Sequence, residues 1–200
     1  EKTGRAGKRV APFDQKRGDR EALSEAQWTE QTRQERQFYD GVYHRQDDLT
    51  SRLAEPLSVR EVYALALLGA RRGNLVLDVG SGSGRHAVEI GRRGAVVLAV
   101  DIALKGLEQG RALAQLAGQA QQVCNVSMDA HRLALADQSV DLVFGAQVLH
   151  HLDCAQAGAE IGRVLRPGGR AVFIENSDRN PVLRWARRHL MGRFGIRRYG

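Results

Sequence analysis

The chain has 200 residues, which is enough for one domain with a proper hydrophobic core and too few for two of ordinary size. Its hydrophobic fraction of 42% and charged fraction of 26% exclude a fibrous or wholly disordered protein. The formal net charge of +7 is concentrated near the two ends, which indicates solvated tails or an acidic partner. No apolar run approaches the roughly 20 residues of a membrane span, and the first ten residues lack the apolar core of a secretory signal. We therefore expect a cytoplasmic protein without a transmembrane segment.

Three segments precede the first expected strand. Residues 1–22 are polar and basic, which predicts a disordered leader. Residues 23–72 predict N-terminal helices, the first of which starts near Ser24 and carries aromatic residues from Trp28 to Tyr43. A further helix should begin near Ser58 and stop at Gly69 or Gly73. Its apolar residues are expected to pack against a sheet; they are Val59, Val62, Tyr63, Leu65, Ala66 and Leu67.

Residues 73–200 are expected to form the main domain, in which strand-like and helix-like segments alternate. The expected strands are 74–80, 95–101, 121–127, 139–146 and 170–176, and the expected helices are 85–93, 103–117 and 153–165. A Pro-Gly-Gly turn at 167–169 should precede the last strand. Continuous apolar strands that alternate with amphipathic helices indicate a parallel sheet covered on both faces. The predicted class is a doubly wound, mainly parallel α/β fold.

A glycine-rich turn lies where the first strand meets the next helix, the position at which such folds bind nucleotides. It contains Gly80, Gly82 and Gly84 in a G-x-G-x-G spacing, preceded by Asp78. The dinucleotide fingerprint needs its third glycine at the position that Arg85 occupies, which argues against an NAD-dependent oxidoreductase. A P-loop is excluded because no Lys-Ser/Thr pair follows the turn.

Acidic residues follow the next two strands. Asp101 ends the second strand about 20 residues beyond the glycine turn, where its two oxygens could accept hydrogen bonds from ribose hydroxyls, although it could also cap the next helix. Asp129 follows the third strand and could accept a hydrogen bond from the amino group of adenine, although Asp also favours loops for local reasons. Three strand ends are therefore predicted to converge on one adenosine.

Four segments together resemble the class I S-adenosylmethionine-dependent methyltransferases: VLDVGSGSGRHAVEIGRRGAVVLAVD, MDAHRLALADQSVDLVF, VLHHL and RVLRPGGR. The resemblance covers about residues 74 to 176. It implies a Rossmann-like fold of the methyltransferase type 11 kind that binds S-adenosylmethionine and releases S-adenosylhomocysteine. It further implies that the methionine part is held by Asp78, Gly80, Ser81, Gly82 and Gly84, the ribose by Asp101, and the adenine by Ile102, Asp129 and Ala130, with Gly145 closing the pocket.

His150 and His151 follow the fourth strand, at the edge where donor and acceptor should meet. A neutral imidazole there could take a proton from an acceptor, or these residues could shape the pocket or cap a helix. Arg85 and His86 are expected to pack or to contact a carboxylate. Glu175, Asn176 and Asp178 follow the fifth strand, but they do not define a metal site, and the two cysteines lack metal-ligand spacing, so no metal is expected.

The resemblance implies methyl transfer to oxygen, nitrogen or carbon of a small biosynthetic molecule, with residues 23–72 as an acceptor-side cap. The alternatives are a methyltransferase acting on RNA or protein, suggested by the basic ends, and a binding or regulatory module without turnover. Nucleic acid is the less favoured partner because no NPPY-type or paired-Cys motif follows the fourth strand.

After its fifth strand the usual class I domain continues with a helix and two more strands. Residues 177–200 suffice for the helix alone, so we expect the last strands to be lacking, whether naturally or because the sequence is a fragment. An exposed sheet edge would favour a homodimer. The last segment predicts a basic amphipathic helix that packs on the core or, less favoured, lies on a membrane surface.

Overall fold

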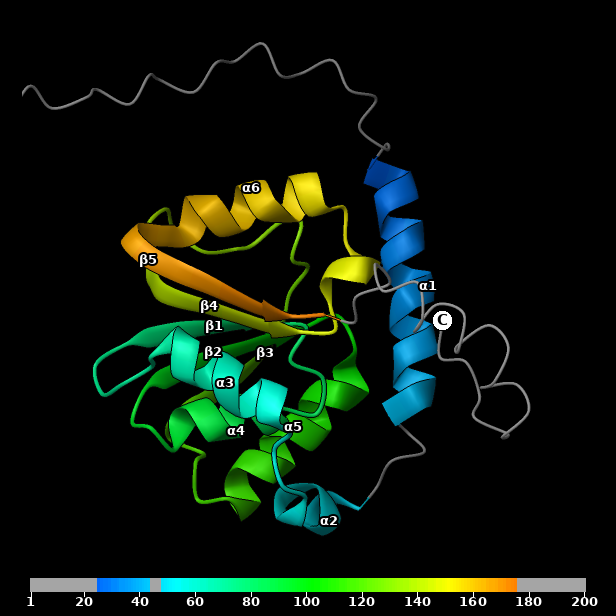
Figure 1. Cartoon of the computed structure of the whole chain (residues 1–200). Helices are drawn as coiled ribbons and strands as arrows, with labels where there is room; N and C mark the ends of the chain where they lie inside the picture. The colour runs from blue at the N-terminus through cyan, green and yellow to red at the C-terminus, as the bar shows by residue number, and fades with distance from the viewer. Residues whose placement is uncertain (1–24, 44–47, 176–200) are drawn as a thin grey trace, which may run out of the picture.

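The computed structural model describes residues 25–43 and 48–175, which are coloured in Figure 1. Nothing is described of the side chains at 25–29 and 31, so the role expected for Trp28 is left open. The expected leader, the basic C-terminal helix, Ser24, Asn176 and Asp178 lie outside the described residues. Among the helices that are described, none is both long and apolar enough to cross a bilayer.

A five-stranded sheet forms the centre of the domain, and all of its neighbouring strands are parallel. Its strands are β1 (Leu75–Val79), β2 (Val96–Asp101), β3 (Val123–Ser127), β4 (Val140–Ala146) and β5 (Leu165–Ile174), in the order β3-β2-β1-β4-β5. The chain moves outward from β1 to β3 and then returns to β4 on the other side of β1. This reversal leaves a crevice at the carboxyl ends of β1 and β4, where doubly wound folds bind ligands.

Helices cover both faces of this sheet, which confirms the predicted doubly wound α/β class (Figure 1). The helices are α1 (Glu25–Tyr43), α2 (Leu49–Ala54), α3 (Val59–Leu68), α4 (Arg85–Gly91), α5 (Leu104–Leu116), the 3-10 turn η1 (Leu149–His151) and α6 (Cys154–Val164). Figure 1 shows α3, α4 and α5 on one face and α6 on the other. The first helix, α1, stands across the end of the sheet toward which the strand arrows point.

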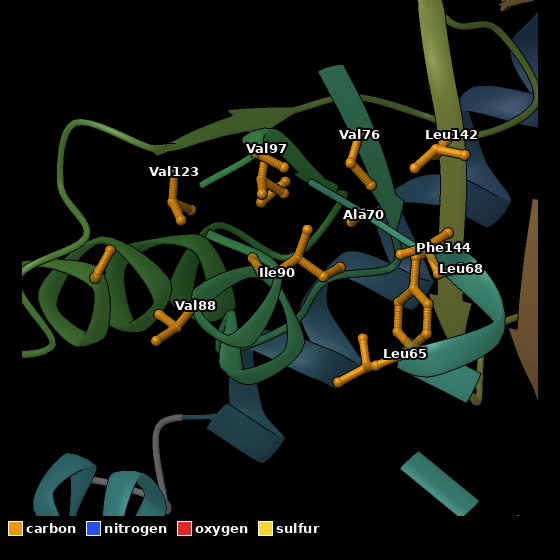
Figure 2. Close-up of a cluster of buried hydrophobic side chains, with 14 of the residues drawn as sticks. Leu65, Leu68, Ala70, Val76, Val88, Ile90, Val97, Val123, Leu142 and Phe144 are labelled. Carbon is orange, nitrogen blue, oxygen red and sulfur yellow. The ribbon is translucent and has the colours of Figure 1, made fainter. Parts of the chain in front are cut away.

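Two hydrophobic clusters hold these layers together, because successive strand residues point to opposite faces of the sheet. One cluster joins the sheet to α3, α4 and α5 and is drawn in Figure 2, where its labelled side chains include Leu65, Ile90 and the fully buried Phe144. The other cluster lies under α6 and includes Leu77 and Val143. The strand ends are therefore fixed by a core on each side.

The exposed face of α3 differs from the sequence prediction. Of the apolar residues expected to face the sheet, Leu65 is buried at 1% exposure, whereas Val59 and Tyr63 are 85% and 65% exposed. The helix carries apolar side chains on all of its sides, so its own sequence does not define one buried face. The face that packs against β5 is the buried one, and it also carries Ala64 and Leu68.

The fifth strand also begins earlier than predicted, at Leu165 rather than at Arg170. Val140 pairs with Leu165 and Leu142 pairs with Arg170, so the Pro-Gly-Gly segment is an irregularity within the strand rather than a turn before it. Gly168, at φ +80°, provides the backbone conformation that this irregularity needs.

Candidate functional site

A cavity of about 430 Å³ opens at the carboxyl ends of β1, β2, β3 and β4, beneath α1. This volume lies within the usual range of small-molecule sites. Of the predicted site residues, the cavity is lined by Gly80, Asp101, Ile102, Asp129, Ala130, His150 and His151. The remaining predicted residues, Asp78, Ser81, Gly82, Gly84 and Gly145, do not line it. The structure thus brings the ends of four strands to one cavity.

The glycine turn is shaped by close packing within the protein. Gly84 has φ +76° and is the N-cap residue of α4, and a Cβ there would lie 2.9 Å from the Cα of Gly110 on α5. A Cβ at Gly82 would collide with the hydroxyl oxygen of Tyr43 at the end of α1. The turn therefore lets two helices approach the strand end closely.

Asp101 is held rigidly at the edge of the cavity. Its Oδ2 accepts a hydrogen bond from the backbone N–H of Gly82 and its Oδ1 accepts one from Ala103, both at 2.8 Å. Burial raises the pKa of Asp101, and these N–H groups oppose that shift. Each carboxylate oxygen can still accept a second hydrogen bond.

Asp129 is tied to the rest of the site by His131. Its Oδ1 accepts hydrogen bonds from the backbone N–H of His131 at 2.9 Å and from Nδ1 of the same residue at 2.7 Å. Because Nε2 of His131 accepts the N–H of Asp153 at 3.0 Å, the proton of this neutral imidazole resides on Nδ1. Burial works to raise the pKa of Asp129, but the hydrogen bonds from His131 outweigh it and the pKa is lowered.

Asp78 lies behind the glycine turn, only 2% exposed. Its Oδ2 is buried and has no hydrogen-bond partner among the described residues. Burial, and after it the nearby charge of Asp101, raises the pKa of Asp78 to about 8. A buried carboxyl of this kind is costly to ionise unless a cation or a donor accompanies it.

Helix α1 roofs the cavity and is attached largely through polar contacts. Arg36 Nε donates to the carbonyl oxygen of Ile102 at 2.8 Å, and the backbone N–H of Lys105 donates to Asp40 Oδ1 at 2.8 Å. Thr32 Oγ1 donates to Asp129 Oδ2 at 3.3 Å. The helix therefore bridges the predicted ribose and adenine positions.

Three further α1 residues, all aromatic, complete the roof. Tyr43 lies against Gly82, and burial followed by the charge of Asp101 raises its pKa. Tyr39 lies 2.7 Å from Nε2 of His151, and Phe38 packs edge-on against Tyr39. The aromatic residues within 28–43 indicate a helix that covers the cavity. The contact of Tyr43 with Gly82 and the hydrogen bond of His131 to Asp129 do not follow from the sequence pattern.

The two histidines after β4 lie side by side, with ring centroids 3.9 Å apart. His150 Nδ1 lies 2.8 Å from Oε2 of Glu175. Burial, and the neighbouring His150, lower the pKa of His151. Gly145 lies behind this segment, where a Cβ would be 2.6 Å from the ring of Phe173, so its small size accommodates that ring.

Arg85 and His86 meet a carboxylate away from the cavity. His86 Nε2 lies 2.8 Å from Glu61 on α3, and Arg85 lies 3.8 Å from the same side chain. Burial lowers the pKa of His86, while Glu61 opposes that shift. These residues join α4 to α3. Within the described parts of the chain, no group of three or more potential metal ligands occurs.

The fold and the convergence of a glycine turn with two acidic strand ends define a nucleoside-binding domain of the class I methyltransferase type. Residues 77–173 match the family model described as a methyltransferase domain. The chain therefore carries a class I S-adenosylmethionine-dependent methyltransferase domain.

Several named proteins are similar to this chain. An uncharacterized methyltransferase of Mycobacterium tuberculosis is 38% identical over 122 residues, covering 60% of this chain and 47% of that protein. A demethylmenaquinone methyltransferase of Thermobifida fusca is 39% identical over 118 residues, covering 56% of this chain and 48% of the relative. The chain thus spans about half the length of these relatives.

Solved structures agree with the fold. A geranyl diphosphate methyltransferase in complex with S-adenosylmethionine has a TM-score of 0.55 at 25% identity, over 57% of this chain and 47% of that one. A putative methyltransferase of Bacillus halodurans has a TM-score of 0.57 at 26% identity, over 63% of this chain and 55% of that one.

Proposed function

We propose that this protein transfers a methyl group from S-adenosylmethionine to oxygen, nitrogen or carbon of a small molecule. The observation that carries this proposal is the meeting of Gly80, Asp101 and Asp129 at one cavity. Three strand ends with these residue types suit the methionine, ribose and adenine of the donor, respectively. A demethylmenaquinone methyltransferase among the relatives supports a small acceptor.

The residues present fit this donor. Asp101 is held by Gly82 and Ala103 and retains acceptor capacity for ribose hydroxyls. Asp129 has its Oδ1 committed to His131, so its Oδ2, which also contacts Thr32, would accept the adenine amino group. The unpartnered Oδ2 of Asp78 suits a nearby ammonium or sulfonium charge. Ile102 and Ala130 would flank the ring.

The donor supplies a methyl group that is already activated, so the protein has to orient the acceptor and exclude water. The α1 roof performs both tasks in this proposal, since Phe38, Tyr39 and Val42 line the cavity opposite the strand ends. A roofed cavity of about 430 Å³ favours a small molecule over RNA or protein as acceptor. A cytoplasmic location, a homodimer and contact with a membrane surface stay predictions of the sequence.

The first test is calorimetric titration of the chain with S-adenosylhomocysteine, with NAD as a control ligand. Asp101→Ala should weaken binding about 10- to 100-fold, because hydrogen bonds to a charged group contribute about 1.5–3 kcal/mol each. Asp137→Ala, at a side chain 73% exposed and outside the cavity lining, is the matched control and should bind normally. Absence of binding by a folded wild-type chain would refute the donor site.

The acceptor is then sought by following methyl transfer from labelled S-adenosylmethionine to a panel of phenols, hydroquinones, amines and carboxylic acids. A chain that binds the nucleoside but methylates no acceptor would support a binding module without turnover.

A further inference from the structure

We propose that Glu175 is a positioning residue that prepares His150 to take a proton from the methyl acceptor, and that this acceptor carries a hydroxyl group. The inference rests on the proposed function. It deepens that function by assigning a role to a residue at the end of β5 and by naming the chemical class of the acceptor.

The hydrogen bond between His150 and Glu175 sets the tautomer of the imidazole. His150 Nδ1 lies 2.8 Å from Glu175 Oε2, and a carboxylate can only accept, so Nδ1 carries the proton. The lone pair is then on Nε2, which makes no hydrogen bond to any residue that the structure describes. Since His150 lines the cavity, that nitrogen is available to an acceptor.

Glu175 is itself fixed by the backbone of the segment that carries the histidines. Its Oε1 accepts hydrogen bonds from the N–H groups of Val148 at 2.8 Å and Leu149 at 2.7 Å. Oε1 thus holds the turn into η1 while Oε2 holds the imidazole. The geometry of the pair is therefore set before any ligand binds.

The neighbouring His151 has a different position and a different partner. Its Nε2 lies 2.7 Å from the hydroxyl of Tyr39 on α1, so it connects η1 to the roof. The two rings are 3.9 Å apart, and a proton on one imidazole therefore disfavours a proton on the other. Glu175 faces His150, whereas His151 is held by Tyr39.

This arrangement suits an acceptor that must lose a proton to become nucleophilic. The proton of the acceptor hydroxyl moves to His150 Nε2, and an oxygen electron pair forms the bond to the methyl carbon. The carbon–sulfur bond breaks with its electron pair left on sulfur, which gives S-adenosylhomocysteine, and His150 later returns its proton to water. A neutral amine already has a free electron pair and needs no such base before attack, so the pair favours a hydroxyl.

The test uses the full chain with ¹⁵N-labelled histidine and bound S-adenosylhomocysteine, and long-range ¹H–¹⁵N spectra identify which ring nitrogen is protonated. His150→Gln assigns the signals. In the wild type, His150 should carry its proton on Nδ1, and in Glu175→Gln this preference should be lost. Glu160→Gln is the matched control, because Glu160 likewise accepts a backbone N–H, from Leu133 at 2.9 Å, outside the cavity lining. A wild-type His150 protonated on Nε2 would overturn the assignment without any variant.

A second measurement tests the acceptor class with 4-nitrocatechol, whose visible absorption reports ionisation of its hydroxyl. The wild type and Glu160→Gln should increase the phenolate absorption, whereas Glu175→Gln and His150→Gln should not. No increase with the wild type would overturn the hydroxyl assignment. Donor binding is measured separately by calorimetry, so failure of the proposed function is distinguishable from failure of this inference.

Discussion

The buried Asp78 makes the stability of the domain depend on pH in a direction opposite to that of most carboxyl groups. Its pKa of about 8 lies above the value of about 3.9 expected in the unfolded chain. Between these values the folded chain binds one proton more than the unfolded chain. The stabilisation of the folded chain by the protonated Asp78 is therefore fully present below about pH 4. It is lost as the pH rises toward 8, by about 1.4 kcal/mol per pH unit.

Asp78→Asn removes this titration and should flatten the pH dependence. By pH 7 the wild type has crossed about 3 pH units of that range, which corresponds to about 4 kcal/mol of lost stability. The amide of Asp78→Asn places a polar NH₂ group at the same buried position, which adds a pH-independent cost, so the prediction concerns the change of stability with pH.

Urea unfolding followed by circular dichroism at pH 5, 6, 7 and 8 measures this effect. Relative to the wild type, the free energy of unfolding of Asp78→Asn should rise by about 1.4 kcal/mol per pH unit between pH 5 and 7, and by less between pH 7 and 8, where the wild-type carboxyl begins to ionise. Asp137→Asn, whose side chain is 73% exposed, is the control, with a curve parallel to the wild type. Parallel curves for the wild type and Asp78→Asn would refute the reasoning, because the carboxyl would then be ionised in the folded chain.

Two other substitutions test the packing of the core and the glycine turn, and a third tests the polar contacts of Glu61. Phe144→Ala removes a fully buried ring between the sheet and α3 and should lower the free energy of unfolding by about 3–5 kcal/mol in urea. Gly84→Ala combines φ +76° with a 2.9 Å approach to Gly110, so it should cost about 1–3 kcal/mol; an unchanged melting temperature would contradict that packing. Glu61 has its pKa lowered to about 2, as burial is outweighed by hydrogen bonds from Ser58 and His86. Glu61→Gln should therefore destabilise at pH 7, and the difference measured by thermal unfolding should disappear as the pH falls from about 4.3 to 2.

The sheet and its helices could be predicted because apolar runs alternate with amphipathic segments, and parallel strands place their carboxyl ends together. That geometry also predicts that Gly80, Asp101 and Asp129 lie close together at one edge of the sheet, since each is at or just beyond the carboxyl end of a strand. The buried face of α3 could not be predicted, because apolar residues surround that helix and only its contact with β5 selects among them.

The details of the site depend on contacts between residues far apart in the chain. Tyr43 reaches Gly82 only because α1 crosses the strand ends, and no local periodicity encodes that crossing. The tautomer of His131 is set by the N–H of Asp153, more than twenty residues later. Sequence spacing identifies the candidates, but it does not determine which of them share a proton or a surface.

The position of α1 has a consequence for engineering. None of the α1 side chains that the structure describes belongs to the two buried clusters, and the attachments of this helix to Ile102, Lys105 and Asp129 are individual hydrogen bonds. Under the proposed function, Phe38, Tyr39 and Val42, which line the cavity, can be randomised while Arg36, Asp40, Thr32 and Tyr43 are kept. Such a library would explore new acceptors on an unchanged donor-binding scaffold.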